Sequence, residues 1–202
     1  ASDISSEAAV VMENTTNTIL YSKNADEVLF PGSTVKIMTC LLALENTQLT
    51  DEVTMTATGV SGVTDGGASI SSQVDEVFTV EQCLYAIMVA SANDIALQIA
   101  EHVGGSVDGF VQQMNTRAQE LGCTNTVFTN PTGLPDDNQH TTAHDTALIM
   151  QAAIQNESFR TIAAATSYTI PATNKAAARN LTSKFTMTDT GSTGFYEGCI
   201  GG

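Results

Sequence analysis

Apolar positions change their spacing twice along the chain. Two short apolar runs, at residues 8–12 and 19–21, flank a polar turn-forming stretch at residues 14–17, which predicts a β-hairpin. After Pro31 and Gly32, apolar residues follow helical spacing at positions 37, 38, 41, 42 and 44, so we expect a helix that begins near Ser33. From residue 167 the spacing returns to that of a strand.

The middle of the chain is predicted to be mostly helical. Residues 50–78 are rich in Thr, Ser, Gly and Val and indicate loops with short strands at most. Thr79 and Gln82 fit a capping box that opens an apolar helix, and a polar break at residues 91–94 interrupts it. Further helices are expected near residues 106–121, 142–154 and 157–165, with a loop at 130–135, and Thr142 with Asp145 suggests a second capping box.

This order of elements favours an α/β fold with two lobes. Strands occur near both ends of the chain and helices occupy the region between them. We therefore expect an antiparallel sheet lobe flanked by helices, formed by residues 1–50 and 167–202, and an inserted mostly helical lobe at residues 51–166.

Composition narrows the possible partners. The 202 residues carry 22 Asp and Glu against 7 Lys and Arg, a net charge of −15, which argues against nucleic acid and anionic membrane surfaces. The longest apolar run, at residues 83–90, is far shorter than the roughly 20 residues of a spanning helix. No signal peptide is visible and the chain does not begin with Met, so we expect a processed or trimmed chain.

The four cysteines offer little chemistry of their own. Cys40, Cys83, Cys123 and Cys199 form no CxxC pair, so a metal or thioredoxin-like site has no support. Free buried thiols are favoured, and a single disulfide is left as the alternative.

Ser33 and Lys36 form the strongest candidate for catalysis. Positions three apart share one helix face, so the Lys36 amine can reach the Ser33 hydroxyl. The positive end of the helix dipole favours a neutral amine there, which can then act as a base towards the serine. Free backbone N–H groups at the helix start can also hold an oxyanion. An ordinary capped helix start has the same short pattern, so this motif alone does not establish a site.

Ser91 and Asn93 form the second candidate. They lie in a polar break between two apolar helical stretches. Polar groups buried at such a break must be hydrogen-bonded within the protein or take part in its function. The functional interpretation is that both side chains face Ser33 and Lys36 across a cleft. A simple joint between two helices is the alternative.

These motifs occur in a recognisable order. Residues 30–39 (FPGSTVKIMT) resemble the nucleophile segment of the low-molecular-mass penicillin-binding proteins, the serine-type D-Ala-D-Ala carboxypeptidases of peptidase family S11. Residues 91–94 (SAND) look like their S-x-N motif, and residues 79–93 like the helix that leads to it. Residues 121–126, 130–134 and 141–145 resemble later landmarks of the family, so the resemblance extends over nearly the whole chain.

The resemblance implies a fold, a reaction and residue roles. The fold would be that of the β-lactamases and DD-peptidases. Ser33 would be the acyl-enzyme nucleophile, Lys36 its general base, and Ser91 the relay that carries a proton to the leaving D-Ala. Asn93 would hold Lys36 and bind the substrate's amide carbonyl. The substrate would be a peptidoglycan stem peptide ending in D-Ala-D-Ala, with β-lactams as mimics, no cofactor or metal, and an extracytoplasmic location with any membrane association through segments outside this chain.

The family's third motif, Lys-Thr-Gly, is absent. Residues 197–202 look like the approach to it, so we expect the natural polypeptide to continue, and a protein that ended at Gly202 to be poorly stable and almost inactive.

Other interpretations remain open. A class A β-lactamase would use an additional Glu for deacylation, and no E-x-x-x-N segment follows the second motif. A catalytically inactive binding or regulatory module of the same fold is the other alternative. The Asp-Thr-Gly at residues 189–191 occurs once, whereas aspartic proteases need two carboxylates. His140 and His144 lack a third metal ligand, which favours a surface pair.

Overall fold

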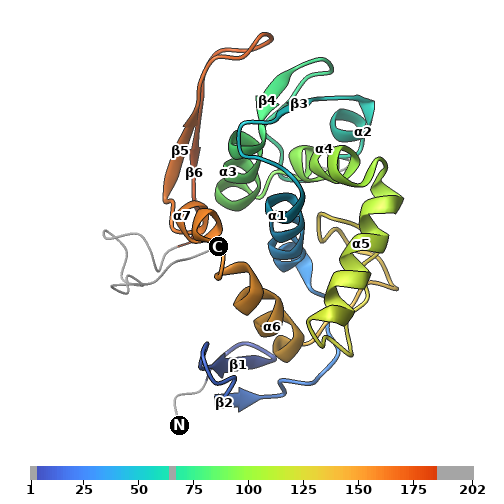
Figure 1. Ribbon diagram of the computed structural model, residues 1–202, viewed down its shortest axis with the longest axis vertical. Helices are drawn as coiled ribbons and strands as arrows, with labels where there is room; N and C mark the ends of the chain where they lie inside the picture. Colours follow the sequence, from blue (N-terminus) through green and yellow to red (C-terminus); the bar gives the residue numbers. More distant parts are fainter. Residues whose placement is uncertain (1–3, 64–66, 186–202) are drawn as a thin grey trace.

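A central helix organises the molecule. In the computed structural model, which describes residues 4–63 and 67–185, α1 lies in the middle and other helices surround it (Figure 1). The α-helices are α1 (Val35–Asn46), α2 (Ala57–Ser61), α3 (Val80–Ala90), α4 (Asn93–Gly104), α5 (Val107–Glu120), α6 (Ala143–Ala153) and α7 (Glu157–Ala163). Helices α3, α4, α5, α6 and α7 all contact α1. A short 3-10 turn, η1 (Gly32–Thr34), leads into α1.

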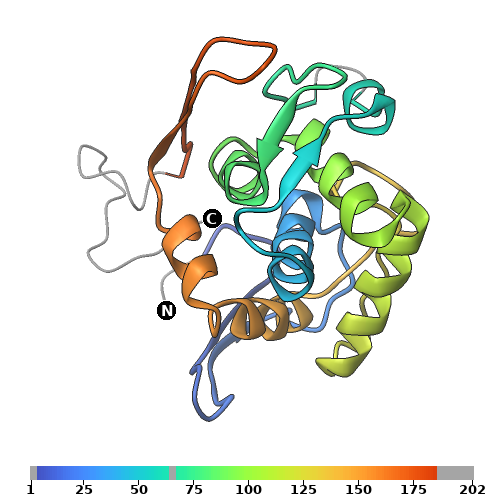
Figure 2. The same cartoon turned by 45° about the horizontal axis from the view of Figure 1, so that its top comes forward.

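The strands form three separate antiparallel pairs within the described part of the chain. Strand β1 (Ala9–Met12) pairs with β2 (Ile19–Lys23), β3 (Glu52–Thr54) with β4 (Val77–Thr79), and β5 (Ser167–Ile170) with β6 (Arg179–Thr182). The β1–β2 pair packs beside α6, and β5–β6 runs along α3 (Figures 1 and 2). The β1–β2 register shifts between Val11 and Met12.

Helix α1 carries apolar residues on nearly all of its faces, and the helices around it bury them. Val35, Met38, Leu41 and Leu42 are all buried, as expected of a helix enclosed within a domain. Two polar residues, Lys36 and Thr39, are also buried in its first turns. Because buried polar groups must be hydrogen-bonded, the segments that pack over Lys36 and Thr39 must supply acceptors for them.

The joint between α3 and α4 has an unusual backbone. The capping box of Thr79 and Gln82 forms and starts α3. The helix ends at Ser91, which adopts left-handed backbone angles of φ 55° and ψ 34°. A non-glycine residue in this region costs roughly 1–2 kcal/mol, and such strain occurs at functional sites more than elsewhere. The break expected at residues 91–94 is therefore a strained corner limited to Ser91 and Ala92, because α4 already begins at Asn93.

Most of the expected elements are confirmed, and the exceptions have physical causes. The hairpin, the helices after Ser33, Thr79 and Ser106, and the α/β class agree with the structure. Helix α2 and strand β6 were not predicted. The second capping box forms only in part: Thr142 accepts from the Asp145 N–H, but the Asp145 carboxylate instead accepts from Asn125 N and Thr126 Oγ1.

Several other expectations concern particular segments. Cys40, Cys83 and Cys123 are buried free thiols. Cys199, residues 189–191 and the C-terminal approach to a third motif lie outside the described residues. Within residues 4–63 and 67–185, no helix is both long and apolar enough to cross a membrane. The division into a sheet lobe (1–50 and 167–202) and a helical lobe (51–166) stays a prediction.

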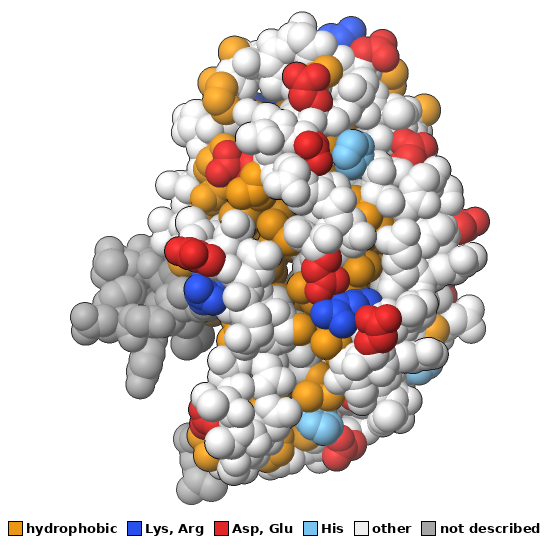
Figure 3. Space-filling view, viewed as in Figure 1, with side chains coloured by type: hydrophobic (Ala, Val, Ile, Leu, Met, Phe, Trp, Pro, Cys, Tyr) orange, Lys and Arg blue, Asp and Glu red, His pale blue; other side chains and the backbone are white. Residues whose placement is uncertain are grey.

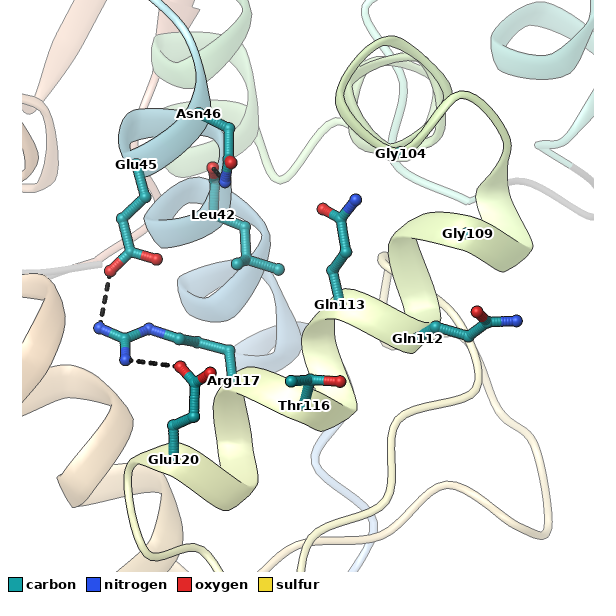
Figure 4. Close-up of a pocket in the computed structure, with 10 residues that line it drawn as sticks. All are labelled: Leu42, Glu45, Asn46, Gly104, Gly109, Gln112, Gln113, Thr116, Arg117 and Glu120. Atoms are coloured by element: carbon teal, nitrogen blue, oxygen red, sulfur yellow. Dashed lines mark hydrogen bonds and ion pairs between the residues drawn. The ribbon is translucent and has the colours of Figure 1, made fainter.

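A polar hollow lies between α1 and α5, away from the start of α1. Arg117 on α5 joins Glu45 of α1 and its own neighbour Glu120, at 2.8 and 3.0 Å (Figure 4). On the face in Figure 3, basic side chains are few and lie beside acidic ones. The Arg117–Glu45 pair links α5 to α1, whereas the Arg117–Glu120 pair lies within α5.

Candidate active site

The Ser33 hydroxyl lies between two other polar side chains. Lys36 Nζ is 3.4 Å from Ser33 Oγ, and Ser91 Oγ donates to Ser33 Oγ at 3.2 Å. Gly32, with φ +55°, turns the chain into α1 and presents Ser33 at the helix start. Three of the four residues predicted from the sequence are therefore brought together: Ser33, Lys36 and Ser91.

Lys36 is buried and lacks a carboxylate partner among the described residues. Its side chain is only 3% exposed, and burial lowers its pKa from 10.5 to about 8. Cys40, one turn further on, opposes this only weakly, because burial raises the pKa of its own thiol to about 12 and keeps it neutral. An amine with such a pKa supplies a substantial neutral fraction near physiological pH, as a general base requires.

A loop at residues 130–134 covers the first turns of α1. The carbonyl of Thr132 accepts from Lys36 Nζ at 2.5 Å, and the carbonyl of Pro131 accepts from Thr39 Oγ1 at 2.8 Å. These two bonds satisfy the two buried polar residues of the helix start. Gly133 lets the loop approach so closely, since a Cβ at this position would lie 1.8 Å from the Gly32 carbonyl oxygen.

Asn93 occupies a different position from the one expected. Its backbone N–H donates to the Ala68 carbonyl at 2.8 Å, and its side-chain Oδ1 is buried without a hydrogen-bond partner in the described part of the chain. Among the described residues, the hydrogen bonds of Lys36 Nζ go to the Thr132 carbonyl and Ser33 Oγ, and none goes to Asn93. The unpartnered Oδ1 is an acceptor still available to a donor.

A pocket of about 470 Å³ opens over the Ser33 hydroxyl. The residues that line it come from η1 and α1, the loop before β4, the end of α3 and the segment after β6: Ser33, Thr34, Lys36, Ile37, Ala68, Ile87, Met88, Val89, Ala90, Ser91, Thr182, Ser183, Lys184 and Phe185. Asn93 does not line it. The pocket is of the size that small-molecule and peptide sites occupy, and Ser33, Lys36 and Ser91 place polar groups beside its apolar lining.

The β5–β6 hairpin, which carries one wall of this pocket, is anchored to the helices. Arg179 forms an ion pair with the fully buried Glu76 at 2.7 Å and lies 5.6 Å from the centre of the Phe78 ring. Tyr85 on α3 stacks on Tyr168 of β5, with ring centres 3.9 Å apart. These contacts fix the hairpin on β4 and the residue before it and, through Tyr85, on α3, whose C-cap is Ser91.

Asp94 fixes the opposite wall. Its carboxylate accepts from Ser69 Oγ at 2.7 Å and from Ser72 through both N–H and Oγ, at 3.1 and 2.8 Å. The side chain is 1% exposed, so these bonds form away from water. They tie the loop that carries Ala68 to the start of α4, directly after the Ser91 corner.

The structure also tests the metal alternatives. No three or more His, Cys, Asp or Glu side chains gather to hold a metal ion within the residues it describes. His144 lies 3.4 Å from the Asp26 carboxylate, whereas His140 Nδ1 contacts the Asn138 carbonyl, so the two imidazoles have separate partners.

Comparison with known proteins assigns the family. Residues 1–199 match the model of the D-alanyl-D-alanine carboxypeptidases, peptidase family S11. The D-alanyl-D-alanine carboxypeptidase DacF of Bacillus subtilis is 38% identical over 156 residues, 75% of this chain and 39% of the relative. The D-alanyl-D-alanine carboxypeptidase of Streptomyces strain K15 is 32% identical over 199 residues, 94% of this chain and 68% of the relative.

Solved structures agree with these relatives. A mutant of the Streptomyces K15 DD-transpeptidase superposes with a TM-score of 0.89 at 30% identity, over 98% of this chain and 80% of that one. The D-alanyl-D-alanine carboxypeptidase DacD of Francisella tularensis superposes with a TM-score of 0.79 at 30% identity, over 88% of this chain. The chain spans 39% of the Bacillus relative and 43% of the Francisella chain. By the family model and these relatives, the chain belongs to the D-alanyl-D-alanine carboxypeptidase family, peptidase family S11.

Proposed function

We propose that this chain carries the nucleophile and general base of a serine-type D-Ala-D-Ala carboxypeptidase, a hydrolase that removes the terminal D-Ala from peptidoglycan stem peptides. The arrangement that supports this most directly is Ser33 Oγ, 3.4 Å from the Lys36 amine and 3.2 Å from Ser91 Oγ. The relatives named above are D-alanyl-D-alanine carboxypeptidases, which supports the same substrate class. We also infer that the enzyme works outside the cytoplasm, where peptidoglycan is found, and that β-lactams acylate it.

The reaction would proceed in two acyl-transfer steps. Neutral Lys36 takes the Ser33 proton while Ser33 Oγ bonds to the carbonyl carbon of the penultimate D-Ala. The tetrahedral intermediate collapses when the carbon–nitrogen bond breaks. Ser91 gives its hydroxyl proton to the departing D-Ala nitrogen and receives the proton that Lys36 took from Ser33, so Lys36 is neutral again. Water then attacks the ester, which releases the shortened peptide and restores the Ser33 hydroxyl. The role expected of Asn93, donation from its side-chain Nδ2 to the substrate's amide carbonyl, stays a prediction, because Asn93 does not line the described pocket. No cofactor or metal is proposed.

The pocket suits this substrate class. It offers a largely apolar surface over Ile37, Ile87 and Val89 beside the Ser33 hydroxyl, which fits the small methyl side chains of alanine residues. The backbone N–H of Ser33, at the start of η1, is a donor suited to the developing oxyanion.

Labelling with a fluorescent penicillin tests this proposal in the full-length protein. The label should attach to Ser33, Ser33→Ala should remove it, and the Ser33→Ala protein should keep the wild-type unfolding temperature. Ser106 provides a control, because Ser106→Ala alters a serine at the start of another helix, α5, that does not line the pocket. A label on any other residue contradicts the assignment of Ser33.

The lifetime of the adduct distinguishes the alternatives. A long-lived penicillin adduct together with D-Ala release from a D-Ala-D-Ala peptide is expected of the carboxypeptidase. Rapid turnover of penicillin would instead indicate a β-lactamase. No adduct and no D-Ala release from the full-length protein would indicate a catalytically inactive module of the same fold.

A further inference from the structure

The general base is held by an acceptor that is not a side chain. Lys36 Nζ has its shortest contact, 2.5 Å, with the backbone carbonyl of Thr132, and the contact with Ser33 Oγ is longer at 3.4 Å. The stem of a lysine has several rotatable bonds, so an amine buried among apolar residues needs a fixed acceptor to stay in one place. The position of the Thr132 carbonyl therefore decides where the amine lies.

The Asn130 side chain shapes the turn that carries this carbonyl. Its Oδ1 accepts from Thr132 N at 3.2 Å, from Thr132 Oγ1 at 2.9 Å and from Gly133 N at 2.8 Å. Its Nδ2 donates to the Leu134 carbonyl at 3.0 Å. One amide thus holds the peptide groups on both sides of Thr132, including the one that contains the Thr132 carbonyl, because asparagine folds the backbone that follows it into a turn.

Gln139 fixes Asn130 in turn. Its Oε1 accepts from the N–H groups of Thr129 and Asn130, at 3.1 and 3.2 Å, and its Nε2 donates to the Leu134 carbonyl at 3.3 Å. The Gln139 side chain is 1% exposed, so water cannot replace these bonds without opening the fold. The two amides together form a connected network that reaches Lys36 through the Thr132 carbonyl.

We propose that Asn130 and Gln139 are positioning residues for the general base. This inference rests on the proposed function. When Lys36 is neutral, one of its N–H groups donates to the Thr132 carbonyl, and the fixed turn leaves the nitrogen lone pair directed at the Ser33 hydroxyl. The proton then moves from Ser33 Oγ to Lys36 Nζ as the Ser33 oxygen attacks. Neither amide touches the substrate or the reacting atoms.

Loosening the turn should change both the rate and its pH dependence. The Thr132 carbonyl would move, and a misplacement of about 1 Å can lower a rate by roughly a hundredfold. Water would also reach Lys36, and because burial is the main cause of its lowered pKa, that pKa should rise from about 8 towards 10.5. A defect in folding alone would lower the active fraction without moving the pH midpoint of acylation.

Single-turnover acylation by fluorescent penicillin, followed from pH 6 to pH 10 in the full-length protein, tests this. Asn130→Ala should acylate at least fivefold more slowly at pH 7 and with a higher pH midpoint than wild type. Asn130→Asp, which keeps an acceptor oxygen for all three donors, should acylate faster than Asn130→Ala. If Asn130→Ala does not fold, Asn130→Ser replaces it under the same criteria.

Asn115 provides the matched control. Its side chain ties the backbone of Phe128 to α5 through bonds of 2.8 Å in both directions, and it has no bond to the Thr132 turn. Asn115→Ala should lower the unfolding temperature and leave the acylation rate and pH midpoint unchanged. A loss below fivefold in Asn130→Ala, an unchanged midpoint, no recovery in Asn130→Asp, or an equal defect in Asn115→Ala would each overturn the proposal. Absence of labelling in wild type would instead contradict the proposed function.

Discussion

Gly133→Ala is expected to damage the candidate site through the backbone alone. Gly133 has φ +81°, a conformation that costs a non-glycine residue roughly 1–2 kcal/mol. The added Cβ would also lie 1.8 Å from the Gly32 carbonyl oxygen, 2.3 Å from the Gly32 carbonyl carbon and 2.9 Å from the Ser33 nitrogen. All three are backbone atoms at the start of α1, so no side chain can rotate away to make room.

The required displacement can be worked out from these distances. Contacts of a Cβ shorter than 3.0 Å essentially do not occur, so the loop and the Gly32 turn must separate by about 1.2 Å to relieve the 1.8 Å contact. The Thr132 carbonyl belongs to the peptide group that precedes Gly133 and must move with it. A shift of that size along the bond would lengthen the 2.5 Å contact with Lys36 beyond hydrogen-bonding distance.

Two magnitudes follow. Overpacking adds roughly 1–3 kcal/mol to the backbone strain, so Gly133→Ala should lower the free energy of unfolding by about 2–5 kcal/mol. Acylation by penicillin should fall by roughly a hundredfold, as expected for a misplacement of about 1 Å next to the general base.

Gly122→Ala is the matched control. Gly122 has φ +83°, nearly the same as Gly133, but a Cβ there would meet no atom within 4 Å. Backbone strain alone should therefore lower the free energy of unfolding of Gly122→Ala by roughly 1–2 kcal/mol, and its acylation rate should match that of wild type. Urea unfolding and single-turnover acylation measure both quantities. Equal stabilities for the two variants, or normal acylation by Gly133→Ala, would refute the reasoning.

Three further predictions concern the base, the strained corner and the hairpin. The acylation rate should rise with pH through about 8 as Lys36 loses its proton. Lys36→Arg should abolish acylation at every pH because a guanidinium stays protonated. A flat pH profile or an active Arg variant would exclude the base role of Lys36. Ser91→Gly should be about 1 kcal/mol more stable than Ser91→Ala in urea unfolding, since φ 55° suits glycine, while both variants acylate slowly; a more stable Ala variant would contradict the strain. Arg179→Met should lower the free energy of unfolding by about 3–5 kcal/mol, because it leaves the buried Glu76 carboxylate without its ion-pair partner. Adding Glu76→Met should restore much of that stability. If the double variant is no more stable, the loss of the ion pair is not the cause.

The parts of the site that sequence reasoning could find are local. Ser33 and Lys36 lie three residues apart on one helical turn, so their contact depends only on the helix that the apolar spacing already predicts. Ser91 is 58 residues from Ser33; the polar break in an apolar helical pattern marked it as a candidate, and only the resemblance to a family gave it a role. The αL backbone of Ser91 has no signature in the sequence, because glycine or asparagine is the usual residue in that conformation.

Helix α2 and strand β6 were missed because neither has a strong helical or strand pattern in its own sequence. Helix α2 contains Thr, Gly, Val and Ser, which are weak helix formers, and forms because Thr56 caps it and Glu101 accepts from both Thr56 and Thr58. Strand β6 carries one buried apolar residue, Leu181, and forms because β5 and the Arg179–Glu76 pair hold it in place. In both cases the determining contacts come from distant segments, so tertiary context overrides local preference.

The reactivity of Lys36 shows why a short motif identifies a site but cannot establish it. A Ser three residues before a Lys at an exposed helix start would leave that amine in water, with a pKa near 10.5 and almost no neutral fraction at pH 7. Here burial lowers the pKa to about 8, and the cover over the amine includes a loop whose acceptor carbonyl lies 96 residues away in the chain. Gly133 permits that loop to approach, while Asn130 and Gln139 set its shape. The residues that would make Lys36 a base are therefore found by following its hydrogen bonds outward, so mutagenesis should cover the segment at 130–139 as well as the motif itself.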